Sequence, residues 1–161
     1  MTVTEFNTCV DQYADNVYRF IVKNIRDTDK ARDIVQDTYE KVWMKVTELD
    51  AAKVKSYLFT TAYNTMIDVI RREKFQGDFE QVNEIHYVTQ NGFTDIKTVL
   101  NEALGKLPEI QRSVIVLRDY EGYSYEEIGA ITNLNESQVK VYIYRARVFL
   151  KEYIGSLDSV I

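Results

Sequence analysis

Basic side chains gather near the end of the chain, in the stretch SYEEIGAITNLNESQVKVYIYRAR (Ser124 to Arg147) and the turn that follows it. The cations are Lys140, Arg145, Arg147 and Lys151, and no acidic residue occurs between positions 140 and 151. Cations concentrated on one helix can bind the phosphates of a polyanion. The formal net charge of the chain is -5, so this cluster stands on an acidic background that discourages indiscriminate binding to nucleic acid. We therefore expect a polyanionic partner for this segment.

A second basic patch lies between residues 53 and 74. It consists of Lys53, Lys55, Arg71, Arg72 and Lys74, set against Asp68 and Glu73. Residues 75–94, in contrast, contain three acidic residues and no Lys or Arg. Charges on surface helices also cluster by chance, so the two patches alone would not establish a nucleic-acid partner.

The cluster near the C-terminus lies on the second of two helices whose starts are marked in the sequence. Ser124 with Glu127, and Asn135 with Gln138, have the spacing of a capping box, in which each side chain satisfies a backbone N–H of the other residue. The turn between the two helices contains Asn133, and asparagine tolerates the left-handed conformation that such turns need. These features predict a helix-turn-helix. Its buried face is expected to consist of Tyr125, Ile128, Ile131, Leu134, Val139, Ile143, Ala146 and Leu150.

A helix-turn-helix with a basic second helix predicts binding to duplex DNA. In this motif the N-terminal part of the second helix enters the major groove, while cations reach the phosphates. The same motif also occurs as mere packing. The paired capping boxes, the acid-free run and the small Gly129, which lets one helix cross another closely, favour DNA binding. The residues expected to face the bases are Glu136, Ser137, Lys140, Val141 and Tyr144.

The remainder of the chain also has helical periodicity, and we predict an all-α protein. Apolar residues recur every three or four positions, and strand-like alternation is limited to residues 85–88. Helices are predicted at about 4–24, 28–46, 56–72, 95–106, 108–118, 125–131 and 136–153. Periodicity fails from about residue 73 to 94. The expected organisation is therefore two small helical domains, residues 1–74 and 95–161, joined by a flexible acidic linker at 75–94.

Composition excludes several classes of function. Cys9 is the only cysteine and His86 the only histidine, so neither an internal disulfide nor a Cys/His zinc site can form. The sequence contains no Ser/His/Asp set, no phosphate-cradling Gly-rich loop and no metal-ligand cluster. We expect no enzyme activity, no catalytic residue, no metal, no cofactor and no small-molecule substrate. No apolar run approaches the roughly 20 residues of a membrane span, and a cytoplasmic location is expected.

Segments in both halves resemble the extracytoplasmic-function (ECF) group of bacterial RNA polymerase sigma factors. LPEIQRSVIVLRDYEGYSYEEIGAITNLNESQVKVYIYRAR (Leu107 to Arg147) is similar to the promoter-reading region 4 of that family. KARDIVQDTYEKVW (Lys30 to Trp43) and SYLFTTAYNTMIDVIRRE (Ser56 to Glu73) are similar to its region 2. The resemblance implies a protein that binds core RNA polymerase and promoter DNA. It is also compatible with a membrane-linked anti-sigma factor as a partner, although no residue identifies one.

The resemblance implies three sets of site residues. A polar ridge at positions i, i+3, i+4 and i+7 of one helix is expected to dock on a coiled coil of the largest polymerase subunit: Asp33, Gln36, Asp37 and Glu40. The melted minus-10 strand is expected to contact Lys55, Tyr57, Asn64, Asp68, Arg71 and Arg72. The minus-35 duplex is expected to contact Arg118, Glu136, Ser137, Lys140, Val141, Tyr144, Arg145 and Arg147.

The chain departs from the family pattern on its second basic helix. Many family members have a small polar residue and then an arginine where this chain has Val141 and Tyr142. The change removes a hydroxyl and a cation, so one phosphate contact is expected to be lost and the promoter preference to differ. Valine can instead contact the methyl group of a thymine.

Two other classes of function remain open from the residues alone. A stand-alone helix-turn-helix regulator would bind its operator as a dimer and would leave the ridge from Asp33 to Glu40 without a role. A helical adaptor that does not bind DNA would keep its function when Lys140 and Arg145 are neutralised. The promoter sequence, the regulon and the inducing signal do not follow from any of these residues.

Overall fold

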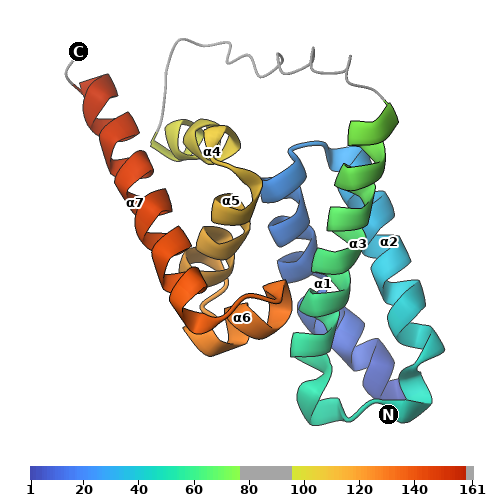
Figure 1. Cartoon of the computed structure of the whole chain (residues 1–161). Coiled ribbons are helices and arrows are strands. Elements are labelled where there is room, and N and C mark those ends of the chain that lie inside the picture. Colours follow the sequence, from blue (N-terminus) through green and yellow to red (C-terminus); the bar gives the residue numbers. More distant parts are fainter. Residues whose placement is uncertain (77–95, 159–161) are drawn as a thin grey trace.

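The part of the chain that the structure describes, residues 1–76 and 96–158 of a computed structural model, consists of helices and short turns (Figure 1). The first half contains α1 (Val3–Ile25), α2 (Thr28–Met44) and α3 (Val54–Gln76), with 3-10 turns at Val46–Glu48 and Ala51–Lys53. The second half contains α4 (Ile96–Lys106), α5 (Glu109–Ile115), a π-helical turn at Val116–Tyr120, α6 (Tyr125–Thr132) and α7 (Glu136–Asp158). The all-α prediction is confirmed for these residues.

The segment predicted to be a linker, residues 75–94, is described only at its start. Helix α3 runs to Gln76, so it reaches into the segment 75–94 that was predicted to be a linker. The rest of that predicted linker, including the strand-like residues 85–88, lies outside the described residues. None of the described helices combines the length and the apolar character that a bilayer span requires.

Local capping explains where the first helices begin and end. Thr2 and Glu5 form a capping box at the start of α1, with the Glu5 N–H donating to Thr2 Oγ1 at 3.1 Å. Arg26 ends α1 in the left-handed conformation, with φ of 63°. Asp27 then caps α2 by accepting hydrogen bonds from the N–H groups of Asp29 and Lys30. These signals place a sharp reversal between α1 and α2.

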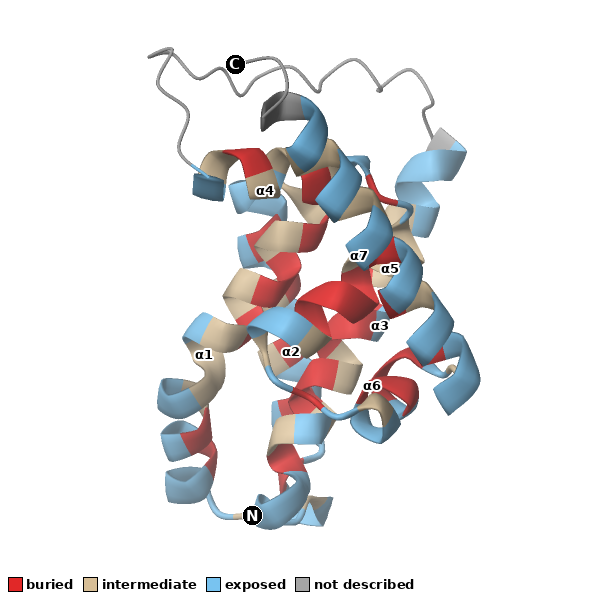
Figure 2. Ribbon diagram, turned by 90° about the vertical axis from the view of Figure 1, so that its left-hand side faces the viewer, coloured by how far each residue is buried: buried red, intermediate tan, exposed pale blue. Residues whose placement is uncertain are grey.

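Helices α1, α2 and α3 pack on one another around large apolar side chains. Figure 2 marks the buried residues of the ribbon in red. Phe20 and Ile21 of α1 and Leu58, Phe59 and Met66 of α3 have no exposed surface. Each such side chain contributes about 1.5–3 kcal/mol to stability when it is fully buried. This packing holds the exposed faces of α2 and α3 in fixed directions.

A second group of apolar side chains holds the helices of the second half. Ile115 of α5, Leu117 of the π-helical turn, Ile128 and Ile131 of α6 and Ile143 of α7 are all buried. Helix α7 packs along both α5 and α6, and its N-terminal end also contacts the turn before it. The long α7 is therefore fixed on one face and open on the other.

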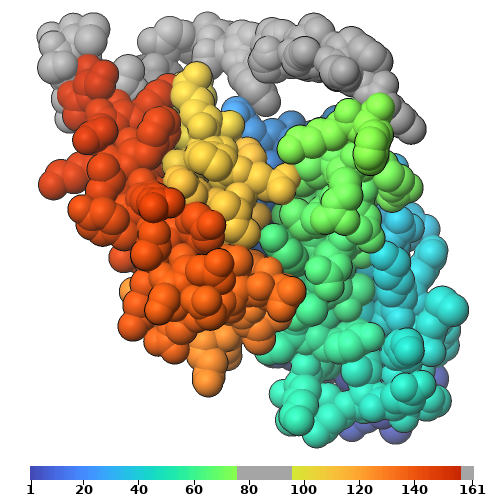
Figure 3. Space-filling model, viewed as in Figure 1, coloured from blue at the N-terminus to red at the C-terminus, as the bar shows by residue number. Residues whose placement is uncertain are grey.

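The two halves lie against each other (Figure 3). Helix α3 packs on α6, and α1 packs on α4 and α5. The contact surface between the halves, called the seam below, includes Arg19, Lys23, Asn24, Lys55 and Phe59 from the first half and Asn101, Ser113, Glu121 and Tyr123 from the second. The prediction of two small helical domains did not foresee that they would share a contact surface.

Candidate nucleic-acid interface

The helix-turn-helix predicted from the sequence is formed by α6 and α7. Ser124 and Glu127 make a reciprocal capping box, with N···O distances of 2.8 and 3.1 Å, and Asn135 and Gln138 do the same at 3.0 and 2.8 Å. Asn133 ends α6 with φ of 62° and ψ of 42°, the left-handed conformation expected for it. Both helix starts and the turn therefore follow from short sequence signals.

Gly129 is required at this turn for a different reason from the one that the sequence suggested. A Cβ atom at position 129 would lie 2.6 Å from the backbone oxygen of Leu134, well inside a van der Waals contact. Leu134 also donates its N–H to the Gly129 carbonyl at 3.0 Å. The close approach is thus to the backbone of the turn rather than to a crossing helix.

Helix α7 presents its predicted DNA-contacting residues to solvent. Val139, Ile143 and Ala146 are buried on the packed side. The exposed side carries Glu136, Ser137, Lys140, Val141, Tyr144, Arg145 and Arg147, which are seven of the eight residues predicted to contact the minus-35 element. A helix with one face fixed and the other open has the geometry of a recognition helix.

Arg118, the eighth predicted residue, lies differently. Its side chain is half-buried, and Nη1 donates a hydrogen bond of 2.9 Å to the carbonyl of Tyr123. Its guanidinium also lies 4.5 Å from the centre of the Tyr125 ring. In this arrangement Arg118 holds the loop that precedes α6, because both of its contacts are to that loop and to the first residue of α6.

The basic residues of α7 are not free of acids in space. Lys140 Nζ lies 3.4 Å from the carboxylate of Glu136, one turn earlier, and Arg147 donates to Asp119 at 2.6 Å. The hydrogen bond that Arg147 donates to Asp119 raises the pKa of Arg147, so this cation remains charged. The acid-free run in the sequence therefore does not describe the surroundings of these cations. Exposed ion pairs contribute about 0–1 kcal/mol, so phosphates can replace the carboxylates at little cost.

Helix α3 carries a second polar surface. Asn64, Asp68, Arg71 and Arg72 are exposed along it, which brings together four of the six residues predicted to contact the minus-10 strand. Arg71 lies 3.8 Å from the Asp68 carboxylate, and Arg72 Nε donates to the Asp68 carbonyl at 3.4 Å. The side chains can thus offer both an amide and cations to a single strand.

Lys55 and Tyr57, the other two predicted minus-10 residues, are half-buried near the start of α3. The Lys55 ammonium lies 4.9 Å from the centre of the Tyr123 ring and 5.9 Å from that of Tyr13. Lys55 therefore lies at the seam, and in this arrangement part of its surface is covered by the second half of the chain.

The acidic ridge of α2 is exposed as the spacing predicted. Asp33, Gln36, Asp37 and Glu40 all face solvent, while Ile34, Thr38 and Val42 are buried beneath them. The end of the same helix adds an exposed apolar surface. Trp43 is 44% exposed and Met44 79% exposed, and the Trp43 ring packs edge-on against Phe6 at 5.0 Å.

Both halves of the chain match families of known proteins. The family model Sigma-70 region 2 matches residues 9–76, and the family model Sigma-70, region 4 matches residues 97–150. The ECF RNA polymerase sigma factor SigM of Bacillus subtilis (strain 168) is 30% identical over 157 residues, which cover 94% of each chain. The RNA polymerase sigma factor SigV of the same organism is 32% identical over 154 residues, which cover 94% of this chain and 92% of SigV. The chain belongs to the ECF sigma factors.

Solved structures support this assignment. The sigma factor RpoE of Bartonella quintana, in complex with the anti-sigma factor NepR, has a TM-score of 0.80 at 28% identity, covering 95% of this chain and 98% of RpoE. CnrH, in complex with the cytosolic domain of CnrY, has a TM-score of 0.68 at 25% identity and covers 94% of this chain and 88% of CnrH. Recognition of promoters is the function of this family, and a stand-alone helix-turn-helix regulator is not favoured for this sigma factor.

The seam of this sigma factor contains polar contacts that sequence reasoning missed. Asn24 and Ser113 are both buried, and the Ser113 hydroxyl donates to Asn24 Oδ1 at 3.0 Å. The seam also contains the Phe59 and Tyr123 rings, which meet edge to face at 5.2 Å. Asn24 and Ser113 are 89 positions apart in the chain, so no local pattern could have paired them.

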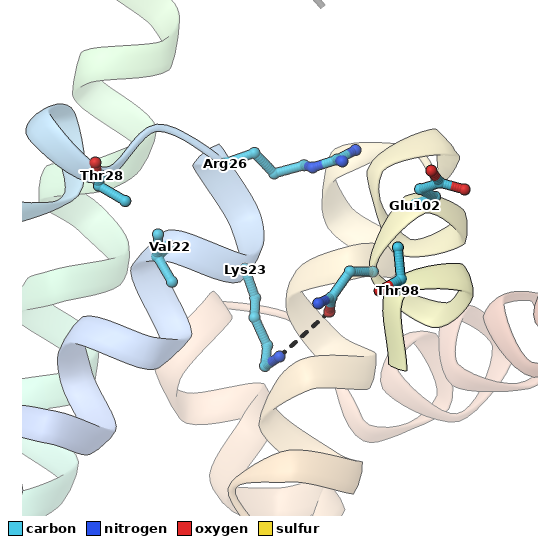
Figure 4. A pocket seen from close by; sticks show the side chains of 7 residues that line it. Val22, Lys23, Arg26, Thr28, Thr98 and Glu102 are labelled. Atoms are coloured by element: carbon cyan, nitrogen blue, oxygen red, sulfur yellow. Dashed lines mark hydrogen bonds between the residues drawn. The ribbon is translucent and has the colours of Figure 1, made fainter. Parts of the chain in front are cut away.

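A pocket of about 330 Å³ opens at one end of the seam, between α1 and α4 (Figure 4). Lys23 and Arg26 point from α1 toward α4, and Lys23 Nζ donates to Asn101 Oδ1 at 3.4 Å. Burial, followed by the nearby charges of Arg19 and Lys97, lowers the pKa of Lys23. No group of three or more His, Cys, Asp or Glu that could hold a metal ion occurs among residues 1–76 and 96–158.

Proposed function

We propose that this ECF sigma factor binds core RNA polymerase through α2, reads the minus-35 duplex through α7 and holds the melted minus-10 strand on α3. The observation that carries the proposal is the presence, in one chain, of an outward-facing helix-turn-helix and a separate exposed acidic ridge. A regulator that acts alone needs the first surface and has no use for the second. The proposed domains are residues 1–74 and 95–161.

The ridge on α2 suits a basic protein partner. Three of its four side chains are carboxylates, and they follow one another along a single helix face. Trp43 and Met44 extend the ridge with an apolar patch, and an aromatic anchor beside charged residues is typical of protein interfaces. We propose that the polymerase covers the ridge and this patch together.

The DNA-contacting surfaces of α7 and α3 have complementary tasks. Helix α7 suits duplex DNA, because its exposed face can enter the major groove while its cations lie near phosphates. The exposed side of α3, with Asn64, Arg71 and Arg72, offers hydrogen-bond donors to unpaired bases and phosphates. Binding energy gained only with the melted strand would shift the duplex toward opening.

The two halves must separate for both DNA contacts to form at once. The minus-35 and minus-10 elements are about 25 base pairs apart, or about 85 Å at 3.4 Å per pair. A folded chain of this length has a radius of gyration of about 15 Å. In the structure the two halves are in contact along the seam, an arrangement called closed below. Because α6 packs on α3 and leads directly into α7, the closed arrangement brings α3 and α7, the two DNA-reading helices, too near each other. We propose that the polymerase holds the halves apart.

Regulation of this sigma factor is proposed by analogy with its structural neighbours. RpoE was solved in complex with the anti-sigma factor NepR, and CnrH in complex with the cytosolic domain of CnrY. We propose a cytoplasmic protein without enzyme activity that is held by an anti-sigma factor until needed.

A run-off transcription assay with core RNA polymerase and a promoter library tests the function. We expect initiation at defined positions only when the protein is added. Asp37→Arg should weaken capture of core enzyme without unfolding the protein, because Asp37 is exposed. The control is Asp11→Arg, which makes the same change on the exposed surface of α1. Equal capture by wild type and Asp37→Arg would remove the ridge from the interface, and tight promoter binding without polymerase would favour the stand-alone regulator.

A further inference from the structure

An apolar stripe runs along the middle of the exposed face of α7. Ser137, Val141, Tyr144 and Val148 follow one another at i, i+4, i+7 and i+11 and lie within about 60° around the helix at 100° per residue. Val141 is 43% exposed, Tyr144 69% and Val148 37%. This stripe points away from the buried Val139, Ile143 and Ala146. Packing in the core therefore does not explain why these exposed positions are apolar.

Cations border the stripe on both sides. At 100° per residue, Lys140 and Arg145 fall on opposite sides of it, each about 70° from its centre. Both side chains are exposed, with Lys140 next to Glu136 and Arg145 at 6.0 Å from the Tyr142 ring. An apolar stripe between two cations fits a groove whose floor carries apolar groups and whose two edges are lines of phosphates.

Several polar side chains of this helix that could read bases have partners within the protein, and Arg145 lies to one side of the stripe. Bidentate reading uses Arg or Lys with guanine and Asn or Gln with adenine. Gln138 is bound to Asn135 in the capping box, Glu136 is paired with Lys140, and Arg147 is held by Asp119. Within the stripe, the polar groups are the hydroxyls of Ser137 and Tyr144. Apolar contact is therefore the main means of reading that this face offers.

The thymine C5-methyl group is the apolar feature that base pairs present in the major groove. We propose that Val141 and the ring of Tyr144 read thymine methyl groups in the minus-35 element of this sigma factor. The preferred element then contains thymines, on either strand, at the positions that face α7. This inference rests on the proposed function and names the chemistry by which its promoter is chosen.

Deoxyuridine substitution tests the proposal, because it removes the methyl group and keeps every hydrogen-bonding group of the base. A promoter that the holoenzyme uses is selected first, and each thymine of its minus-35 element is then replaced singly. Holoenzyme binding to each duplex is measured by fluorescence anisotropy. We expect one or two substitutions to weaken binding by the wild-type protein about fourfold, the effect of one buried methyl group.

The variants assign the contact to particular side chains. Val141→Ala should bind the thymine and deoxyuridine promoters equally at one of the sensitive positions, since the interaction is already lost. Tyr144→Phe, which removes only the hydroxyl, should keep the sensitivity, and Tyr144→Ala should abolish it at a second position. Ile96→Ala is the matched control, because Ile96 is also apolar and 62% exposed but lies on α4. This control should keep the wild-type response at every position.

The outcomes separate this inference from the proposed function. If the holoenzyme initiates transcription but no deoxyuridine substitution changes binding, methyl reading is wrong and the sigma function stands. If Val141→Ala and Tyr144→Ala both retain the full wild-type sensitivity, other residues read the methyl groups and the assignment to these two is wrong. If no promoter in the library supports initiation, the function and the inference fall together.

Discussion

Arg19 of α1 and Glu121, which follows the π-helical turn, form a bidentate ion pair across the seam. Arg19 Nε donates to Glu121 Oε2 at 3.2 Å, and Nη2 donates to Oε1 at 3.3 Å. The Glu121 side chain is only 2% exposed, whereas that of Arg19 is 43% exposed. The closed arrangement thus buries a carboxylate whose charge is satisfied from the other half of the chain. Separation of the halves would return both groups to water.

Replacement of Arg19 is therefore expected to open the seam rather than to unfold either half. In Arg19→Glu the buried Glu121 faces a second carboxylate, and loss of a charged hydrogen bond costs about 1.5–3 kcal/mol. The closed-to-open equilibrium constant should fall roughly 10- to 100-fold. Dyes on cysteines introduced at the exposed Lys45 and Glu152 would report lower energy transfer than in the unmutated protein. Arg32→Glu, a charge reversal on the exposed surface of α2, is the control, and equal transfer in all three proteins would show that the pair does not hold the halves together.

The Tyr123 hydroxyl gives a second, opposite test of the seam. It is buried without a hydrogen-bond partner, which disfavours the closed arrangement by about 1–3 kcal/mol. Tyr123→Phe removes that penalty and keeps the ring contact with Phe59, so it should favour closure. We expect higher energy transfer between the same dyes and less transcription at limiting core polymerase. Lower transfer than in the wild type would contradict this account of the hydroxyl.

The same residue predicts a pH dependence of the closed arrangement. Burial, followed by the charges of Glu121 and Glu127, raises the pKa of Tyr123 above the ordinary tyrosine value of 10.0. Because the neutral phenol is the form that the seam accepts, closure is fully stabilised below pH 10 and weakens as the pH rises above it. Energy transfer should fall above pH 10 in the wild type and fall less in Tyr123→Phe. An identical alkaline decrease in both proteins would assign the effect to other groups.

The contrast between the helix-turn-helix and the seam shows what the sequence could predict. The capping pairs of α6 and α7 join residues three positions apart, and Asn133 adopts its left-handed conformation for a local reason. Local chemistry therefore predicted this motif and the exposed ridge on α2. Arg19 and Glu121 are separated by 102 positions, and no local sequence pattern around either residue predicts that the two form an ion pair. Such pairs arise only when the packing of the helices is known.

The basic run on α7 illustrates the same limit. Its lack of acids between residues 140 and 151 suggested unpaired cations, yet Asp119 reaches Arg147 from the π-helical turn and Glu136 reaches Lys140 from just outside the run. Lys55 was likewise predicted as a DNA contact from the resemblance to region 2, and the packing places it against Tyr123. Spacing identified which side chains share a face, but it could not supply the partners that come from other elements.

Gly129→Ala should destabilise the second half, because its Cβ atom would lie 2.6 Å from the Leu134 carbonyl. The backbone of the turn must move to accept it, and overpacking of this kind costs about 1–3 kcal/mol. Gly155→Ala is the matched control, since nothing lies within 4 Å of its Cβ position in α7. That change should stabilise the helix by up to about 1 kcal/mol. Thermal denaturation checks both signs, and equal melting temperatures for the two variants would contradict the close approach at Gly129.

Lys140→Gln tests whether Lys140, which lies beside the apolar stripe of α7, contacts a phosphate. Removal of one phosphate contact should weaken holoenzyme binding to every promoter by a similar factor and reduce the slope of log K against log salt by about one. Lys106→Gln, an exposed change at the end of α4, should leave the slope unaltered. Glu136→Gln should strengthen binding, because it frees Lys140 from its carboxylate partner and removes a negative charge from the groove. If the slope is the same for Lys140→Gln as for the wild type, the Lys140–Glu136 pair persists on DNA and Lys140 is not a phosphate contact.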